Sequence, residues 1–337
     1  MILRLCDLRI NKYPYRKNSE RTRMIKFKTL LFFLFINGMV VLSGCSSHDK
    51  KQMEAIPPLP EKFTEFTLKA ECVADPLIIE IKKESESRDS ILHLLASYID
   101  ISNKDAKPDS PALRKMAKLF SCGQVKDRVE GHFYGITAVL KKGDHPFGGF
   151  LNQLWGATLG DVSPWDGKTF NAVTPDKLTY LTDGFEKGNF PTFLGINCFK
   201  EYKTSFLNMA SMSVLTFWLK LKDVPKQEKQ AFGYGKKGGL FIAKRATSID
   251  PDNFGKEVFQ LNYRWKNLNN PPPLKYLIDE IVQIAEGLFI GPLFFATEHL
   301  LEEYDPKLNP AEYKYENFGY FILMDEDWKD EKKRLFP

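Results

Sequence analysis

The chain has 337 residues, of which 43% are hydrophobic and 27% charged, and this length can bury a sizeable core without help from metals. Its formal net charge of +5 comes from residues 1–44, which contain nine Lys and Arg against two acidic residues; the other 39 basic and 41 acidic residues give the remainder a net charge of −2. A near-neutral body lacks the basic surface that nucleic-acid binding requires, so we expect no nucleic-acid partner.

The first element in chain order is a predicted leader, residues 1–44. A short basic stretch from Met24 precedes the mostly apolar residues 29–42. This apolar run is too short for a membrane-spanning helix, which needs roughly 20 residues, and its length is typical of a signal peptide. We therefore predict a signal peptide over residues 24–44 and interpret residues 1–23 as an extension from a mis-assigned start.

The motif Leu42-Ser43-Gly44-Cys45 ends the leader and resembles the lipobox of bacterial lipoproteins. The resemblance implies that the Cys45 thiol receives a diacylglyceryl group, that the leader is removed, and that the protein is held at a membrane of the cell envelope. Each buried CH2 contributes about 0.8 kcal/mol, so two or three acyl chains give a stable anchor. Ser46 follows the cysteine, and by the sorting rule of enterobacterial lipoproteins this implies the periplasmic leaflet of the outer membrane in a Gram-negative cell. The alternative is an ordinary signal peptide with an incidental cysteine.

The mature chain is expected to begin with a tether and a helical segment. Residues 45–62 carry Cys45 and become Pro-rich, which is typical of a partly extended linker. Residues 63–125 are helical in pattern: a helix around residues 90–100 places four apolar side chains on one face, and Ser110-Pro111 begins another helix that runs to Phe120. The four side chains are Ile91, Leu94, Leu95 and Tyr98.

Residues 126–337 are predicted to form a mainly β domain with inserted helices, packed with the helical segment as one globular unit. In residues 258–265, Phe259, Leu261, Tyr263 and Trp265 alternate with polar residues, which is typical of a half-buried strand. Residues 205–221 are dense in apolar residues, and their pattern leaves helix and strand both open. The expected fold class is α+β, with N-terminal helices followed by an antiparallel sheet or a partial β-barrel. Further strands are expected at 131–140, 239–246, 287–296 and 318–324, and helices at 147–159 and 272–284.

Three cysteines follow Cys45, namely Cys72, Cys122 and Cys198. Outside the cytoplasm two of them can form a disulfide. We favour Cys72–Cys122, because each lies at the edge of a predicted helix in the same region, and three buried free thiols are the alternative. The chain has no C-x-x-C motif and no Cys/His spacing typical of a metal site, so we expect neither a metal nor a cofactor.

Residues 152–170 contain Trp155, Trp165, three glycines and a proline, an unusual density of rigid and aromatic residues. The functional interpretation is an aromatic-walled pocket in which Lys168 or Asp161 orients a polar group. The alternative is a tightly packed structural corner in which Trp165 covers the sheet. The string Trp165-Asp-Gly-Lys168-Thr-Phe170 is similar to the W-x-G-K-x-F element of GXWXG-type domains, which have no settled activity to transfer.

Further candidates for the same pocket are Tyr134 and Arg264, two polar residues in predicted strands. His145 lies in a glycine-flanked loop that suits an exposed imidazole, and with Asp161 it is a weak candidate for acid–base catalysis. The string Gly233-Tyr-Gly-Lys-Lys-Gly238 spells a dinucleotide-binding motif, but it precedes a predicted strand instead of opening a helix, so we interpret it as a turn.

These features favour an envelope lipoprotein that binds an apolar or amphipathic small molecule, which includes a lipid. One alternative is an enzyme that acts on a lipid or envelope substrate, with His145, Asp161 and Lys168 as its candidate residues. The other is a structural or assembly protein of the envelope without a small-molecule site. The membrane is the expected partner through the Cys45 anchor, and the sequence does not indicate a protein partner.

Overall fold

The computed structural model of the protein describes residues 59–104, 110–140, 164–188, 191–201, 213 and 215–336. The chain divides into two units, Met1–Ala55 and Ile56–Pro337, and all described residues belong to the second. Cys45, the predicted helix 147–159, Trp155, His145 and Asp161 lie outside the described residues. Among the helices that the structure describes, none has both the length and the apolar character needed to cross a membrane.

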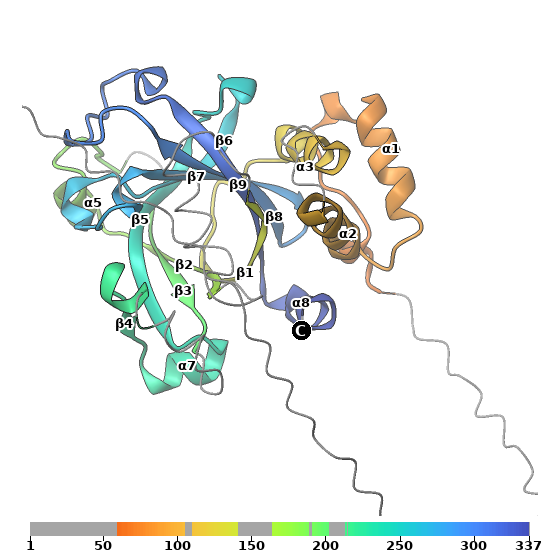
Figure 1. Cartoon of the computed structure of the whole chain (residues 1–337), viewed down its shortest axis with the longest axis horizontal. Coiled ribbons are helices and arrows are strands. Elements are labelled where there is room, and N and C mark those ends of the chain that lie inside the picture. Colours follow the sequence, from red (N-terminus) through yellow and green to blue (C-terminus); the bar gives the residue numbers. More distant parts are fainter. Residues whose placement is uncertain are drawn as a thin grey trace, which may run out of the picture. The chain divides into compact units, whose positions relative to one another are not determined.

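Three helices precede the strands: α1 (Pro76–Ser85), α2 (Ile91–Lys104) and α3 (Pro111–Cys122). Asp75 caps α1 by accepting hydrogen bonds from the backbone N–H groups of its first turn, and Ser110 caps α3 in the same way. Both helices have Pro at their first position, where the missing N–H costs nothing. The apolar face of α2 is buried against the other helices and the outer surface of the sheet. Figure 1 shows the three helices grouped on one side of the sheet, with α8 (Lys329–Leu335) beside α2.

A disulfide joins Cys72, in the turn before α1, to Cys122 at the end of α3, with Cα atoms 5.8 Å apart. It closes a loop across a sequence separation of 50 residues and so links the turn before α1 to the end of α3. Cys198 is a free, buried thiol, so the alternative of three free thiols does not hold in this structure.

Eight strands of the described chain form a closed antiparallel β-barrel, which makes the fold α+β. Each strand pairs with the next one along the chain, and β9 pairs with β1 to close the barrel. Closure leaves no long unpaired edge, and only the short β4 (Lys222–Asp223) extends one end of β5. The barrel strands are β1 (Gly131–Leu140), β2 (Trp165–Ala172), β3 (Phe193–Phe199), β5 (Lys236–Thr247), β6 (Glu257–Asn262), β7 (Leu277–Ala285), β8 (Leu288–Ala296) and β9 (Tyr315–Met324).

Two short helices lie between strands: α5 (Pro175–Leu181) follows β2, and α7 (Lys226–Phe232) precedes β5. Gly233 ends α7 with a left-handed backbone (φ 90°), and β5 begins three residues later. The glycine-rich string is therefore a turn from a helix into a strand, as its sequence context indicates. Residues 215–218 are helical, which decides that part of the apolar stretch 205–221.

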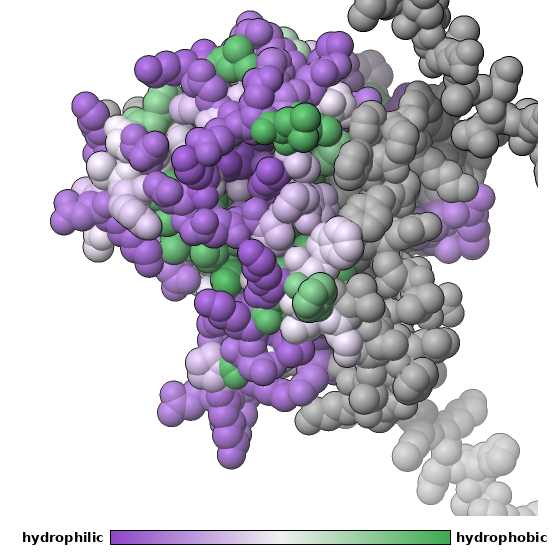
Figure 2. Space-filling view, turned by 60° about the vertical axis from the view of Figure 1, so that its left-hand side comes forward, coloured by the Kyte–Doolittle hydropathy of each residue, from purple (hydrophilic) through white to green (hydrophobic). Residues whose placement is uncertain are grey.

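The interior of the barrel is packed with aromatic and aliphatic side chains that come from all eight barrel strands. Phe133, Phe170, Phe241, Phe259 and Phe321 belong to this cluster. Side chains of opposite parity on the same strands pack outside the barrel, where the helices cover them. On the described part of the face in Figure 2, hydrophilic side chains predominate and hydrophobic ones lie in small separate groups.

Two predictions about the strands are wrong. Residues 272–284 are not a helix: a single 3-10 turn (Leu274–Tyr276) leads into β7, whose residues are all buried. A strand buried on both faces shows no alternation, so its pattern resembles that of a buried helix. The strand predicted over residues 258–265 ends at Asn262, and Trp265 packs outside the barrel against Leu178 and Leu268 instead of sharing the face of Tyr263.

Candidate functional site in the barrel interior

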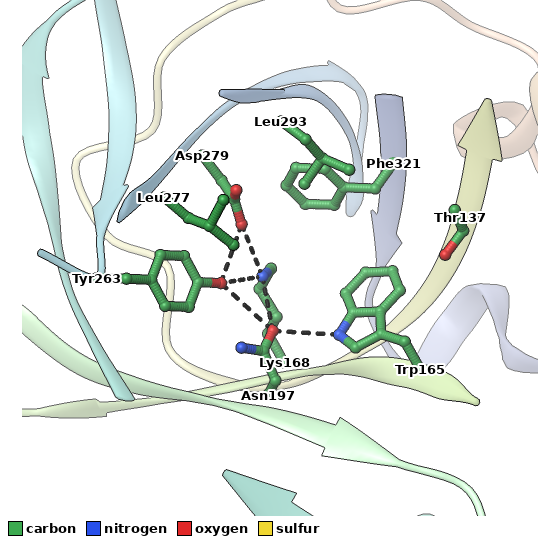
Figure 3. A pocket seen from close by; sticks show the side chains of 9 residues that line it. All are labelled: Thr137, Trp165, Lys168, Asn197, Tyr263, Leu277, Asp279, Leu293 and Phe321. Atoms are coloured by element: carbon green, nitrogen blue, oxygen red, sulfur yellow. Dashed lines mark hydrogen bonds and ion pairs between the residues drawn. The ribbon is translucent and has the colours of Figure 1, made fainter. Parts of the chain in front are cut away.

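The most unusual feature of the barrel interior is a buried lysine that is paired with a buried aspartate. Lys168 and Asp279 are 2% and 1% exposed, and the Lys168 Nζ lies 2.9 Å from Asp279 Oδ2. The ammonium also donates to Asn197 Oδ1 at 2.8 Å and to the Tyr263 hydroxyl. Tyr263 in turn donates to Asp279 Oδ2 at 2.9 Å. These residues point toward one another from different walls of the barrel (Figure 3).

Strand register brings these side chains together. Lys168 on β2 lies directly opposite Asn197 on β3, and Asp279 on β7 lies opposite Leu261 on β6. Tyr263 follows β6 by one residue and keeps the inward direction of Leu261. The site is therefore assembled from four segments that are far apart in the sequence.

A β-bulge explains how Trp165 and Lys168 both face the interior, although an odd spacing of three residues normally places two side chains on opposite faces. The register between β2 and β3 shifts between Trp165 and Gly167. Gly167 has φ +146°, and a Cβ there would lie 2.1 Å from the Phe133 carbonyl oxygen, so only glycine fits. Asp166, beside it, faces outward and pairs with Lys332 at 2.8 Å.

Four aromatic rings surround the Lys168 ammonium, with centroids 5.1 to 5.3 Å from Nζ. At this distance the electron-rich ring faces attract the cation and partly replace its lost hydration. Trp165 also donates from its indole nitrogen to Asn197 Oδ1 at 3.2 Å. The rings belong to Trp165, Phe241, Tyr263 and Phe321.

Burial dominates the electrostatics of the pair. Loss of hydration lowers the pKa of Lys168 and raises the pKa of Asp279, and their mutual attraction opposes both shifts. Within the described residues, Asp279 Oδ1 is buried and accepts no hydrogen bond. A buried charge pair with an unsatisfied oxygen is a poor source of stability compared with apolar packing of similar volume. The cluster therefore presents an acceptor oxygen that a donor group can satisfy.

A small cavity adjoins this cluster, lined also by Thr137, Leu277 and Leu293. Its volume is about 20 Å³, which is room for about one water molecule. Side chains of the wall must move before a larger molecule can enter.

The structure separates the binding residues that the sequence analysis grouped. Trp165 and Lys168 line the same cavity. Tyr134 is buried outside the barrel, where its hydroxyl donates to Glu326 at 2.6 Å. Arg264 also lies outside the barrel, among tyrosine rings. The expectation of one pocket containing all of them is wrong for Tyr134 and Arg264. Tyr134 points outward from β1, and Arg264 lies beyond the end of β6, next to the inward-facing Tyr263.

Sequence reasoning missed Asp279, Tyr263 and Asn197 as site residues. The available signal was the charged pair Asp279-Glu280 inside the apolar run 277–285, which is unusual for a buried segment. The expectation of a helix there hid the fact that Asp279 faces the interior while Glu280 faces outward, where it accepts hydrogen bonds from Ser248 and Ile249.

A second cluster of reactive residue types lies outside the barrel. The His132 Nδ1 is 4.0 Å from Cys198 Sγ and 3.1 Å from the Thr169 hydroxyl. Burial lowers the pKa of His132 to about 4 and raises the pKa of Cys198 to about 12. Both groups are therefore neutral near pH 7, whereas a nucleophilic cysteine requires a thiolate. We assign this cluster to packing.

Comparison of the chain with protein-family models, with curated proteins and with solved structures finds no match. In the described part of the chain, no three His, Cys, Asp or Glu side chains gather as metal ligands would.

Proposed function

We propose that the protein is an envelope lipoprotein, anchored through Cys45, whose barrel binds a small amphipathic molecule at the Lys168–Asp279 cluster. The observation that carries the proposal is this buried charge pair, with the unsatisfied Asp279 Oδ1, inside an aromatic-lined barrel. Barrels of eight strands have an interior that side chains can just fill or that can hold one small ligand. Ligand sites are typically apolar with a few placed polar groups, and this interior has that composition.

The polar groups restrict the chemistry of the ligand. Asp279 Oδ1 requires a hydrogen-bond donor such as a hydroxyl or amide, and Trp165 and Phe321 offer flat apolar surfaces beside it. Because the cavity holds only about one water molecule, binding must displace side chains of the wall. We therefore expect a slow association with a narrow range of small ligands.

Native mass spectrometry of the protein purified from the cell envelope tests the binding proposal. The wild-type protein is expected to carry a molecule of constant mass, and Lys168→Met is expected to lose it. Lys115→Met is the matched control, because Lys115 is a buried lysine on α3 that pairs with Glu80 and Glu84 outside the barrel. A wild-type protein that carries nothing, and whose tryptophan fluorescence is unchanged across a panel of lipids and small alcohols, would favour a purely structural barrel.

The anchor is tested separately with Cys45→Ala. We expect this substitution to release the protein from the membrane fraction, because it removes the thiol that the lipobox resemblance identifies as the acylation site. A variant that stays in the membrane fraction to the same extent as wild type would contradict the lipoprotein proposal and leave the barrel site untouched.

A further inference from the structure

A second cavity, outside the barrel, contains a buried arginine that has no acidic partner among the residues that the structure describes. Arg264 is 4% exposed and lies in the wall of a cavity of about 540 Å³. Its guanidinium carbon lies 3.9 Å from the ring centroid of Tyr313 and 4.8 Å from that of Tyr304, and Nη1 donates to the Tyr315 hydroxyl at 2.6 Å. The Nε is buried and has no hydrogen-bond partner within the residues that the structure describes. Buried charges are usually paired, so this cation has an unmet requirement for an anion.

Other charged residues of the cavity wall strengthen the positive potential. The described lining residues include four cations, Lys220, Arg264, Lys266 and Lys275, and two carboxylates, Glu302 and Glu303, which is an excess of two positive charges in this part of the wall. The carboxylates already have partners: Glu303 pairs with Lys266 at 2.8 Å and Glu302 contacts His299 at 2.7 Å. A concave wall with uncompensated positive charge concentrates anions.

One side of the same cavity is apolar. Trp265, Pro272 and Leu301 line it, and the Leu301 side chain is 100% exposed. Trp218 donates from its indole nitrogen to the Pro272 carbonyl at 2.8 Å, so a second, half-exposed tryptophan lies beside the cavity. The arrangement is a cationic wall next to an apolar one, open to solvent.

We propose that this cavity binds the phosphoryl group of a phosphorylated amphiphile. A phosphate monoester carries close to two negative charges, which matches the excess of the wall, and guanidinium groups hydrogen-bond phosphate oxygens strongly. The volume of about 540 Å³ exceeds the needs of a bare phosphate and leaves space for an organic part against Trp265 and Leu301. The phosphoryl group can belong to a phospholipid or to a soluble organic phosphate. The site is separate from the barrel interior and does not depend on the ligand proposed there.

Calorimetric titration of the purified full-length mature protein in neutral detergent tests the site. The probes are short-chain phosphatidic acid, diacylglycerol of the same chain length, and inorganic phosphate. We expect phosphatidic acid to bind at least about tenfold more tightly than diacylglycerol, because a hydrogen bond from the charged Arg264 to a phosphate oxygen contributes roughly that factor to the affinity. Lys220→Gln and Lys275→Gln are each expected to weaken binding about 2- to 5-fold, and Arg264→Gln about tenfold or more.

Lys83→Gln, on the exposed surface of α1, is the matched control and is expected to leave the affinity unchanged. The variants of Lys220 and Lys275, the two rim lysines of the cavity, keep the test valid if Arg264→Gln fails to fold. Glycerol 3-phosphate, added as a fourth probe, assigns the site to soluble organic phosphates if it competes with phosphatidic acid at equal affinity, and to a lipid if it binds much more weakly. Inorganic phosphate that binds as tightly as phosphatidic acid would show that the organic part is not recognised, and would overturn the proposal. Equal affinity for phosphatidic acid and diacylglycerol, or no effect of either rim lysine, would overturn the proposal.

Discussion

The buried pair in the barrel makes a prediction about stability that also bears on function. Lys168→Met leaves the Asp279 carboxylate 1% exposed without the counter-charge of Lys168, and it removes one of the donors to Asn197 Oδ1. Removing one partner of a buried ion pair typically costs about 3–5 kcal/mol. This is a large part of the roughly 5–15 kcal/mol that stabilises a typical domain.

The double variant Lys168→Met/Asp279→Leu separates the value of the pair from the penalty of an orphaned charge. It removes both charges and fills the interior with apolar atoms of similar volume. We expect its stability to return to that of the wild type, or to exceed it by about 1–4 kcal/mol, since apolar packing replaces two desolvated charges. The control Lys115→Met is expected to cost about 1 kcal/mol or less, because its partners Glu80 and Glu84 are 56% and 38% exposed and water can hydrate them.

Urea denaturation followed by tryptophan fluorescence measures the free energy of unfolding of the wild type, Lys168→Met, Asp279→Leu, the double variant and the control Lys115→Met. The first four proteins together yield the coupling energy of the pair. A Lys168→Met variant that loses no more stability than Lys115→Met would refute the reasoning about burial. A double variant that is no more stable than Lys168→Met alone would show that the intact pair itself stabilises the barrel. A double variant with wild-type stability that has lost the bound molecule would indicate that the pair is retained for binding.

Three further predictions concern other parts of the molecule. Burial raises the pKa of Glu280 from 4.5 to about 7, so the unfolded chain releases this proton at lower pH than the folded protein does. The free energy of unfolding should therefore fall by about 3 kcal/mol as the pH rises from about 4.5 to 7. Glu280→Gln should remove that part of the pH dependence in urea titrations, and a variant that keeps the pH dependence of the wild type would contradict this. Reduction of the Cys72–Cys122 disulfide should lower the free energy of unfolding by about 2–5 kcal/mol, because the unfolded chain is no longer constrained across 50 residues. A melting temperature that reductant leaves unaltered would contradict this prediction. Gly167→Ala should cost at least about 1–3 kcal/mol, because its Cβ meets a β1 carbonyl oxygen, whereas Gly131→Ala has no atom within 4 Å and should cost less; equal melting temperatures would refute the steric argument.

Local patterns in the sequence were sufficient for the elements whose environment differs between their two faces. β6 alternates because Phe259 and Leu261 lie in the barrel core, whereas the polar Gln260 and Asn262 face outward. β5, β8 and β9 have turn residues at their ends and β-branched or aromatic interiors. The density of Trp and Gly around Trp165 and Lys168 marked two residues that share a cavity, whereas the bulge at Gly167 that turns both side chains inward is a feature of the β2–β3 register. The leader and its lipobox are features of the sequence alone and stay predictions.

Other properties depend on contacts between segments that are distant in the chain. β7 has no alternating pattern because helices cover one of its faces and the barrel core covers the other. The partners of Lys168, on β3, β6–β7 and β7, are selected by the closure and register of the barrel, which no local pattern encodes. Arg264 and Tyr134 face outward for the same reason. Residue type indicated which charged and polar side chains need a partner when they are buried. The tertiary structure decided which of them contact one another, because the register of a closed barrel is a property of all its strands together.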